Sequence, residues 1–503
     1  MLTLSYATSR AAEVLLLTAA LEAMAAQAAV APSDPPKRGM RTTEIGTFTG
    51  TTPAALAAMI VARGVDMVYD GDGRKLKDTL TASGTSHAVT QYSYDVVGRM
   101  TCVAQRLNPA TWAALPASAC TLGATGSFGP DRITKSIRDS HGRVVQVQVA
   151  LGTPEQAHER TLAYTFDALN RKLTETGQLG TATSSYNLAG RRTTLALPGG
   201  GITLTYDRDV LGAVTAIREN GATSGIGVLA TYQYDSLGRR SSMTRGNGTS
   251  TSFAFDPVSR LASLTQDLAS TVNDLTQNFT YNPASQIASL TRSNDLYPWT
   301  GHTNQNTSSV ANGRNQLTSI GGVATAHDGR GNLTTDPTTA KTYGYASENM
   351  LTSATGGVTL AYDPILRLGQ VAGAATTRFG YGGIDLLAEG NGTNAILRRY
   401  VPGPGVDEPI VWYEGNGTTD RRWFHADERG SVVAVSNASG ASIITNRYDE
   451  YGTPQTTNAG RFQYTGQKWI GEIGLYDYKT RMYSPFAGGA VRSDRSDRVS
   501  RRY

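Results

Sequence analysis

The sequence predicts an all-β protein built from short strands and tight turns. Only 17% of its 503 residues are charged, 55 are Gly, and Tyr (24) outnumbers both Phe (10) and Trp (5). Tyr favours strands and carries a polar tip that reaches a neighbouring backbone, while Gly suits tight turns. The third observation is a short unit, aromatic-x-aromatic-Asp-x-x-Gly-Arg, which recurs along most of the chain and indicates a repeat architecture.

The chain begins with a lead-in, which we assign to residues 1–64. An Ala/Leu-rich run over residues 11–31 follows Arg10 and ends in small residues, as a secretory signal peptide does. Glu13 and Glu22 interrupt this run, so an amphipathic or poorly ordered helical lead-in is the second interpretation. We expect no stable membrane span here, because a span needs about 20 predominantly apolar residues in succession.

Residues 65–398 form the predicted repeat array. Four positions define each unit: the second aromatic residue, the Asp, the Gly and the Arg. A more degenerate copy combines Tyr206-Asp207 with Gly212. The clearest motif residues are Tyr94, Asp95, Gly98 and Arg99; Tyr234, Asp235, Gly238 and Arg239; and Phe255 with Asp256.

Each unit has the pattern of a β-hairpin. Aromatic residues two positions apart lie on the same face of a strand, because side chains alternate between faces. The Asp side chain accepts backbone hydrogen bonds within the turn, and the Gly three residues later supplies a positive φ. One hairpin cannot bury its aromatic face alone, whereas stacked hairpins can. The aspartates are therefore expected to cap turns rather than to act as paired catalytic carboxylates.

These units resemble the YD repeats of the RHS/YD-repeat family, which is similar in sequence style to the teneurin-like YD shell. The resemblance implies a spiral of β-hairpin repeats that forms a hollow shell or part-shell. A denser block over residues 399–485 resembles the RHS repeat-associated core, which lies at the C-terminal end of that shell. Its motif residues are His425, Asp427, Gly430, Tyr448, Asp449, Tyr451, Gly452, Gly466, Gln467, Gly474, Leu475, Tyr476, Arg481 and Tyr483.

The end of the sequence departs from the family pattern. In many relatives Asp-Pro-x-Gly follows the core and a variable toxin domain comes next, with aspartates near this junction implicated in self-cleavage. Here Phe486-Ala-Gly-Gly follows Pro485, and the chain ends in a basic segment. One DNA string can encode the family junction in one frame and the ending Asp494-Arg-Ser-Asp497-Arg-Val in another. We therefore expect residues 486–503 to be an aberrant, frameshifted tail without a toxin or cleavage junction.

The residue pattern predicts no enzyme chemistry. The six His residues show no metal-ligand spacing, and the sequence has neither a Walker-type loop nor a Gly-x-Ser-x-Gly elbow. We expect no cofactor and no metal, and a structural hydrogen bond for His425 rather than catalysis. Cys102 and Cys120 suit either one loop-closing disulfide in an exported chain or two thiols. The net charge of +5 is scattered, which argues against nucleic-acid binding.

Three functions remain open from the sequence. The first is a non-enzymatic, secreted or surface-associated shell of the RHS polymorphic-toxin type that has lost its toxin cargo. The second is a cell-surface module that binds carbohydrate or a partner protein, as similar YD proteins do. The third is a truncated remnant without a present function.

Overall fold

The computed structural model describes residues 40–45, 61–82, 84–150, 161–301, 308–312, 316–328, 331–346 and 349–491. The predicted all-β class is confirmed, because these residues form antiparallel strands and short 3-10 turns, with no α-helix among them. None of the described segments is a helix with the length and apolar character needed to cross a membrane. The Ala/Leu-rich run over residues 11–31 lies outside the described residues, as does the part of the expected frameshifted tail from residue 492 onward.

The chain divides into two compact units. The first comprises residues 1–137 and 148–156, and the second comprises residues 138–147 and 157–503. The domain boundaries expected after residues 64, 398 and 485 stay predictions.

The first unit is an antiparallel meander in which successive strands pair. A long insertion with a 3-10 turn at Pro109–Thr111 separates its last two strands and covers a small core around Ala104 and Ile133. The strands are β1 (Met40–Ile45), β2 (Val61–Tyr69), β3 (Lys75–Ala82), β4 (Thr85–Tyr94), β5 (Met100–Arg106) and β6 (Arg132–Arg138).

The second unit contains a long meander, here called the first layer, in which each strand from β8 to β19 pairs with the next. β7 (Val144–Gln148) precedes it. Its strands are β8 (Thr161–Phe166), β9 (Lys172–Gly177), β10 (Gly180–Tyr186), β11 (Arg192–Ala196), β12 (Thr203–Arg208), β13 (Val214–Glu219), β14 (Val228–Tyr234), β15 (Arg240–Arg245), β16 (Ser250–Phe255), β17 (Leu261–Asp267), β18 (Leu275–Tyr281) and β19 (Ile287–Arg292).

Three further sheets complete the second unit. A small sheet consists of β20 (Ser309–Ala311), β21 (Leu317–Ile320) and β22 (Val323–Ala324). The second layer consists of β23 (Ala326–His327), β24 (Leu333–Asp336), β25 (Lys341–Tyr345), β26 (Leu351–Ala354), β27 (Val358–Tyr362), β28 (Leu368–Ala372), β29 (Thr376–Gly382), β30 (Asp385–Asn391), β31 (Ile396–Pro402), β32 (Pro409–Glu414), β33 (Arg421–Ala426), β34 (Val432–Ser436) and β35 (Ser442–Thr445). The third layer consists of β36 (Lys468–Ile470), β37 (Leu475–Asp477), β38 (Met482–Ser484) and β39 (Gly489–Ala490).

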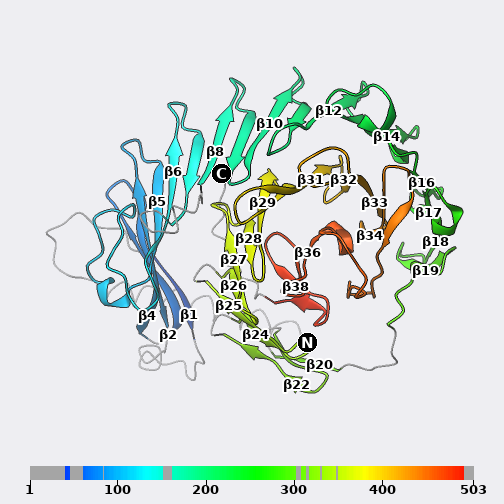
Figure 1. The fold of residues 1–503 in the computed structure, drawn as a ribbon. Coiled ribbons are helices and arrows are strands. Elements are labelled where there is room, and N and C mark those ends of the chain that lie inside the picture. The colour runs from blue at the N-terminus through cyan, green and yellow to red at the C-terminus, as the bar shows by residue number, and fades with distance from the viewer. Residues whose placement is uncertain are drawn as a thin grey trace, which may run out of the picture. The chain divides into compact units, whose positions relative to one another are not determined.

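The second layer is buried on both faces. Trp423 and Tyr413 pack with first-layer residues such as Leu204, whereas Trp412 and Phe424 pack toward the third layer. Adjacent residues of one strand thus enter opposite cores, as the alternation of side chains requires. Within this unit, Figure 1 shows β36 and β38 flanked by the strands of the second layer, with β31–β34 lying between them and the first layer. Burial on both faces explains why residues 399–436 contain nearly continuous apolar runs.

The burial pattern predicts which Leu substitutions lower the free energy of unfolding and which leave it unchanged. Replacing the fully buried Leu204 by Ala removes side-chain contacts in the core between the first two layers and should lower the free energy of unfolding by about 2–5 kcal/mol. The matched control, Leu188→Ala, changes a fully exposed turn residue and should alter it by less than about 0.5 kcal/mol. Urea denaturation measures both, and equal losses would contradict the assigned core.

Candidate functional site

The Asp of each repeat organises its own turn. In the β14–β15 hairpin, Asp235 Oδ1 accepts hydrogen bonds from the backbone N–H groups of Leu237 (3.0 Å) and Arg239 (2.9 Å). Its other oxygen, Oδ2, accepts the Arg239 Nε–H at 2.7 Å. Gly238 has φ of 75°, a conformation that suits Gly because it has no Cβ. Both oxygens of the carboxylate are therefore used to hold the turn.

The same carboxylate–guanidinium pair recurs in both units. The Asp Oδ2–Arg Nε distance is 2.6 Å in the Asp70 and Asp167 turns and 2.7 Å in the Asp95 and Asp256 turns. Further copies are Asp139–Arg143 and Asp363–Arg367. The hydrogen bond from Arg239 lowers the pKa of the Asp235 carboxyl, whereas burial raises the pKa of Asp363. Ser259, which replaces the Gly in the Asp256 turn, also has a positive φ, at 68°.

In several repeats the Tyr that precedes the turn residue joins its repeat to the one before. The Tyr234 hydroxyl donates to the carbonyl of Val214 at 2.9 Å, and the Tyr281 hydroxyl donates to that of Leu261 at 2.7 Å. In both cases the acceptor is the first residue after the turn of the preceding repeat. Within the first unit, Tyr94 makes the same bond to Lys75 at 2.8 Å.

In several turns the Arg also contacts the next repeat. The Arg239 guanidinium carbon lies 4.3 Å from the centre of the Phe255 ring, and that of Arg260 lies 4.5 Å from the centre of the Tyr281 ring. A cation over an aromatic face is an attractive arrangement. We call the paired contacts, Arg over the next ring and Tyr hydroxyl to the previous carbonyl, the inter-repeat bridge. The sequence analysis did not predict this role of Arg. The constant spacing of four residues from Asp to Arg was the signal that could have indicated it.

One repeat was aligned wrongly from the sequence. Asp207 does not begin a turn, because β12 continues to Arg208 and Asp207 is paired with Ala216 of β13 within the sheet. The turn residue is Asp209, whose Oδ1 accepts the N–H of Ala213 at 2.9 Å. Asp207 instead forms an ion pair with Arg218 at 2.5 Å.

The core block continues the turn chemistry of the repeats. Asp427 Oδ1 accepts the N–H groups of Arg429 (2.9 Å) and Ser431 (2.8 Å), with Gly430 at φ 81°. Asp449 accepts the N–H groups of Tyr451 and Thr453 in the same way, with Gly452 at φ 88°. The Tyr448 hydroxyl donates to the carbonyl of Val432, the first residue after the Asp427 turn, at 2.8 Å.

Two core-motif residues, Gly466 and Gln467, meet the loop between β31 and β32. Gly466 lies so close to this loop that a Cβ added there would stand 2.2 Å from the carbonyl oxygen of Asp407. The side-chain amide of Gln467 donates to Asp407 Oδ2 at 2.8 Å, and Lys479 binds the other carboxylate oxygen. Backbone proximity therefore requires Gly at 466, and Asp407, which was not among the predicted site residues, is the acceptor that connects loop and third layer.

The remaining core-motif residues surround the Asp449 turn. The hydroxyls of Tyr476 and Tyr483 donate to the carbonyls of Gly452 (2.9 Å) and Tyr451 (2.8 Å). Leu475 is buried in the core beneath them, Gly474 has φ of 71°, and Arg481 is exposed.

His425 is a buried hydrogen-bonding residue between the first two layers. Its Nε2 lies 2.8 Å from Ser436 Oγ and its Nδ1 lies 3.3 Å from Gln266 Oε1, so a neutral ring can accept from one and donate to the other. Burial, together with the positive charge of Arg245, lowers the pKa of His425 well below its ordinary value. These contacts place His425 in a structural position.

Ion pairs also connect the first and second layers. Glu219 accepts from Arg421 at 2.7 and 2.8 Å and from the Tyr413 hydroxyl at 2.6 Å. Glu175 binds Arg367 at 2.7 Å, so the turn Arg of one repeat reaches a strand of the other layer. These charged groups are satisfied by partners, as burial requires.

The two Cys residues lie in the first unit and form a disulfide. The bridge joins β5 to the insertion that follows it. Beside it, the buried Arg106 donates to Asp131 Oδ2 at 2.6 Å and to the carbonyls of Thr121 (2.8 Å) and Ser118 (3.0 Å). The disulfide and this ion pair together fix the insertion on the sheet.

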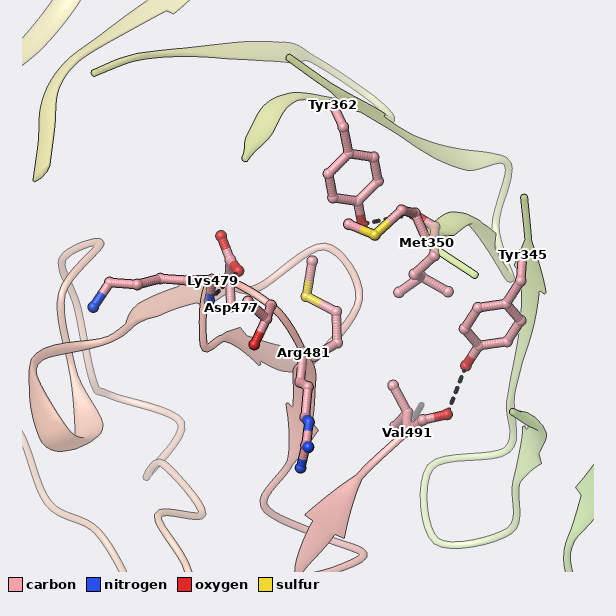
Figure 2. A pocket seen from close by; sticks show the side chains of 10 residues that line it. Tyr345, Met350, Tyr362, Asp477, Lys479, Arg481 and Val491 are labelled. Carbon is pink, nitrogen blue, oxygen red and sulfur yellow. Dashed lines mark hydrogen bonds between the residues drawn. The ribbon is translucent and has the colours of Figure 1, made fainter. Parts of the chain in front are cut away.

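Two pockets lie in the second unit. The first has a volume of only about 10 Å³ and lies next to the last described residue. Figure 2 shows its lining, where the Tyr345 hydroxyl reaches the Val491 carbonyl. The second pocket, of about 30 Å³, lies beside the Asp407 loop. Among the described residues, no group of three or more His, Cys, Asp or Glu side chains is placed to hold a metal ion.

The fold and the inter-repeat bridges define an all-β repeat protein. No family model matches the chain. Over 189 residues it is 29% identical to the tRNA3(Ser)-specific nuclease WapA of Bacillus spizizenii and 26% identical to the tRNA nuclease WapA of Bacillus subtilis. Each match covers 35% of this chain and 8% of the relative.

A solved structure shares the fold over most of the chain. It is a chain of the Photorhabdus luminescens Tc holotoxin pore, with a TM-score of 0.50 and 14% identity, covering 87% of this chain and 30% of that one. The likeness concerns the fold. With the partial sequence matches, it is consistent with the RHS/YD-repeat resemblance.

The turn geometry predicts the effect of removing a turn carboxylate. Asp235→Ala takes away the acceptor for two backbone N–H groups and for Arg239, which also loses its position over Phe255. We expect a lower urea midpoint of unfolding. Asp267→Ala, at an exposed strand end, is the control and should leave the midpoint nearly unchanged. Equal midpoints for the two variants would contradict the role of Asp235.

The buried imidazole predicts a pH dependence. Because the pKa of His425 is lowered in the folded protein, unfolding takes up a proton below about pH 6.5, the ordinary His value. This contribution to stability is fully present above pH 6.5 and is lost progressively as the pH falls. His425→Gln should therefore show a shallower loss of unfolding free energy from pH 6.5 to about pH 5 than the wild type. His141→Gln, at an exposed turn, should match the wild type; parallel curves for His425→Gln would refute the assignment.

Proposed function

We propose that the chain is a non-enzymatic β-shell scaffold of the RHS polymorphic-toxin type. The observation that carries the proposal is the bond from a Tyr hydroxyl to the carbonyl that follows the preceding turn. It recurs at Tyr186, Tyr234 and Tyr281 along the first layer and at Tyr448 in the core. A wall of this kind needs each repeat to position the next one. The hydrogen-bonding groups of the motif residues position the neighbouring repeat.

The hydrogen bonding of the motif residues supports a structural rather than a catalytic role. A catalytic carboxylate needs an oxygen within reach of substrate, whereas both oxygens of Asp235 are bonded within its own turn. His425 is fully buried and bonded between two layers. In this proposal the described residues build a wall and leave catalysis to other polypeptide segments.

The names of the relatives agree with a toxin-related scaffold. The Bacillus proteins are described as tRNA nucleases, and the matched segment is 8% of each, so we propose that the shared part corresponds to repeats rather than to a nuclease centre. Export, and binding to carbohydrate or to a cell-surface protein, stay predictions from the sequence.

A protease-protection experiment tests the scaffold function. An unfolded reporter peptide is attached after Tyr503 in one protein and before Met1 in another, and both are treated with a non-specific protease. If the wall shelters a polypeptide that follows the core, the C-terminal reporter should be cut at least about tenfold more slowly. Equal cleavage of the two reporters would reject the shell.

A second measurement addresses catalysis directly. The purified full chain is incubated with total tRNA, with and without Mg²⁺, and the tRNA is resolved on a denaturing gel. We expect intact tRNA. Cleavage that persists through further purification would overturn the non-enzymatic assignment while leaving the shell test unaffected.

A further inference from the structure

One edge of the first layer carries exposed aliphatic side chains at the tips of its turns. Because the layer is a meander, every second connection lies on the same edge. The connections after β8, β10, β12, β14 and β16 lie on what we call the turn edge, and neighbouring ones are two strands, or about 10 Å, apart. Each places Leu or Val at its tip, and these side chains are at least 66% exposed: Leu169, Leu188, Val210, Leu211, Leu237 and Val258.

The opposite edge of the same layer has a different composition. Its connections consist mostly of Gly, Asn, Ser and Thr, as in residues 220–224 and 246–249. Leu179 and Leu197 of this edge are buried. Among the described residues that connect β9 to β18 on this edge, Val272 is the exposed large apolar side chain. The aliphatic tips are therefore specific to the turn edge and are not a general property of the turns.

The backbone at several tips is already hydrogen-bonded. In the β14–β15 turn the Leu237 N–H donates to Asp235 Oδ1 at 3.0 Å. The N–H groups of Leu169 and Val258 donate in the same way to the Asp of their own turns, at 2.9 and 3.0 Å. An apolar environment penalises N–H groups that have no acceptor. These tips can therefore leave water without exposing those N–H groups to that penalty.

Positive charge accompanies the apolar tips at two neighbouring turns. In the β10–β11 turn Asn187 stands where most repeats have Asp, so Arg191 has no carboxylate partner within its own turn. The Arg191 Nη2 donates to the Leu211 carbonyl of the β12–β13 turn at 2.8 Å. The guanidinium group therefore lies beside the tip of the next turn with its charge unpaired by that contact.

The charge balance around these two turns is positive. Arg208 donates to backbone carbonyls, and Arg192 lies over an aromatic ring. Of the carboxylates around them, Asp209 caps its own turn and the half-buried Asp385 interacts with Arg192. With Arg191, three guanidinium groups face two carboxylates here. An anionic partner is therefore favoured at this part of the turn edge.

We propose that the turn edge of the first layer binds the surface of an anionic lipid bilayer, with the aliphatic tips in the headgroup region and the arginines on lipid phosphates. The tips are separate protrusions, since the Leu188 and Val210 side chains are 103% and 98% exposed. A rigid protein partner would need a matching pocket for each protrusion, whereas lipid adapts to any spacing. Binding of this kind combines buried apolar area with attraction to anionic lipid. The inference does not rest on the scaffold function.

Flotation of the full chain with lipid vesicles tests the proposal. Vesicles of mixed phosphatidylcholine and phosphatidylglycerol are compared with vesicles of phosphatidylcholine alone. Binding to the anionic vesicles should be at least about tenfold tighter and should weaken as salt is added. Absence of binding to the anionic vesicles at low salt, or equal binding to both kinds of vesicle, would overturn the proposal.

Substitutions at exposed tips locate the contact without disturbing the core. Leu188→Ser combined with Leu211→Ser should weaken vesicle binding at least about tenfold, because two aliphatic side chains no longer leave water. Val210→Ser alone should weaken it several-fold. Val272→Ser is the matched control on the opposite edge and should bind as the wild type does. Equal losses for Val210→Ser and Val272→Ser would refute the turn edge as the site.

A variant that restores the motif tests the charge separately. Asn187→Asp gives Arg191 the carboxylate partner that the other repeats have, so the fold is retained while one positive charge is neutralised. It should weaken binding to the anionic vesicles several-fold. Ser224→Asp adds the same charge to an exposed position of the opposite edge and should have little effect. Identical effects of the two variants would contradict a role for Arg191.

Self-association is the competing use of the same edge. Sedimentation velocity in the absence of lipid measures it on the wild type and on the Leu188→Ser/Leu211→Ser variant. We expect the same sedimentation for both proteins. A wild-type dimer that this variant converts to a monomer would assign the turn edge to a second copy of the chain and would overturn the lipid proposal.

Discussion

The array depends on a recurring Asp carboxylate. It accepts hydrogen bonds within its own turn and orients the Arg that contacts the next repeat. Asp235 fixes the turn backbone with one oxygen and orients Arg239 with the other, and Arg239 then covers the ring of Phe255. Local and non-local structure are thereby set by the same side chain. A hairpin alone is marginal in water, so a contact that converts each correct turn into a docking surface for its neighbour is what makes a long meander stable.

Stacking the repeats side by side does not by itself bury the apolar face of the first layer. The second layer covers this face. Its strands place Trp423 toward the first layer and Phe424 toward the third, so one sheet supplies two cores. Ion pairs such as Glu219–Arg421 cross the first of these interfaces, where the carboxylate is almost fully buried. Apolar packing provides the main stabilisation, and the charges fix which strand faces which, because a displaced register would leave them buried without partners.

The sequence was sufficient for the fold class and the turns, because both are local. Asp95, Gly98 and Ser259 follow from turn chemistry that involves only neighbouring residues. It failed at Asp207, where a strand two residues longer moved the turn to Asp209. Asp407 could not be found in advance, since its significance comes from Gln467 and Lys479, which tertiary packing brings to it. Cysteine pairing was also undecidable from spacing alone.

The bond from each Tyr hydroxyl to the carbonyl of the preceding repeat is a contact between nearest neighbours only. Tyr281 needs Leu261 and nothing farther along the chain. Structures coupled in this way behave as one-dimensional systems, in which stability is close to a sum over units and junctions. Whole units of the array can then be gained or lost in evolution without redesign of the others, so that the length of the array becomes a freely adjustable property.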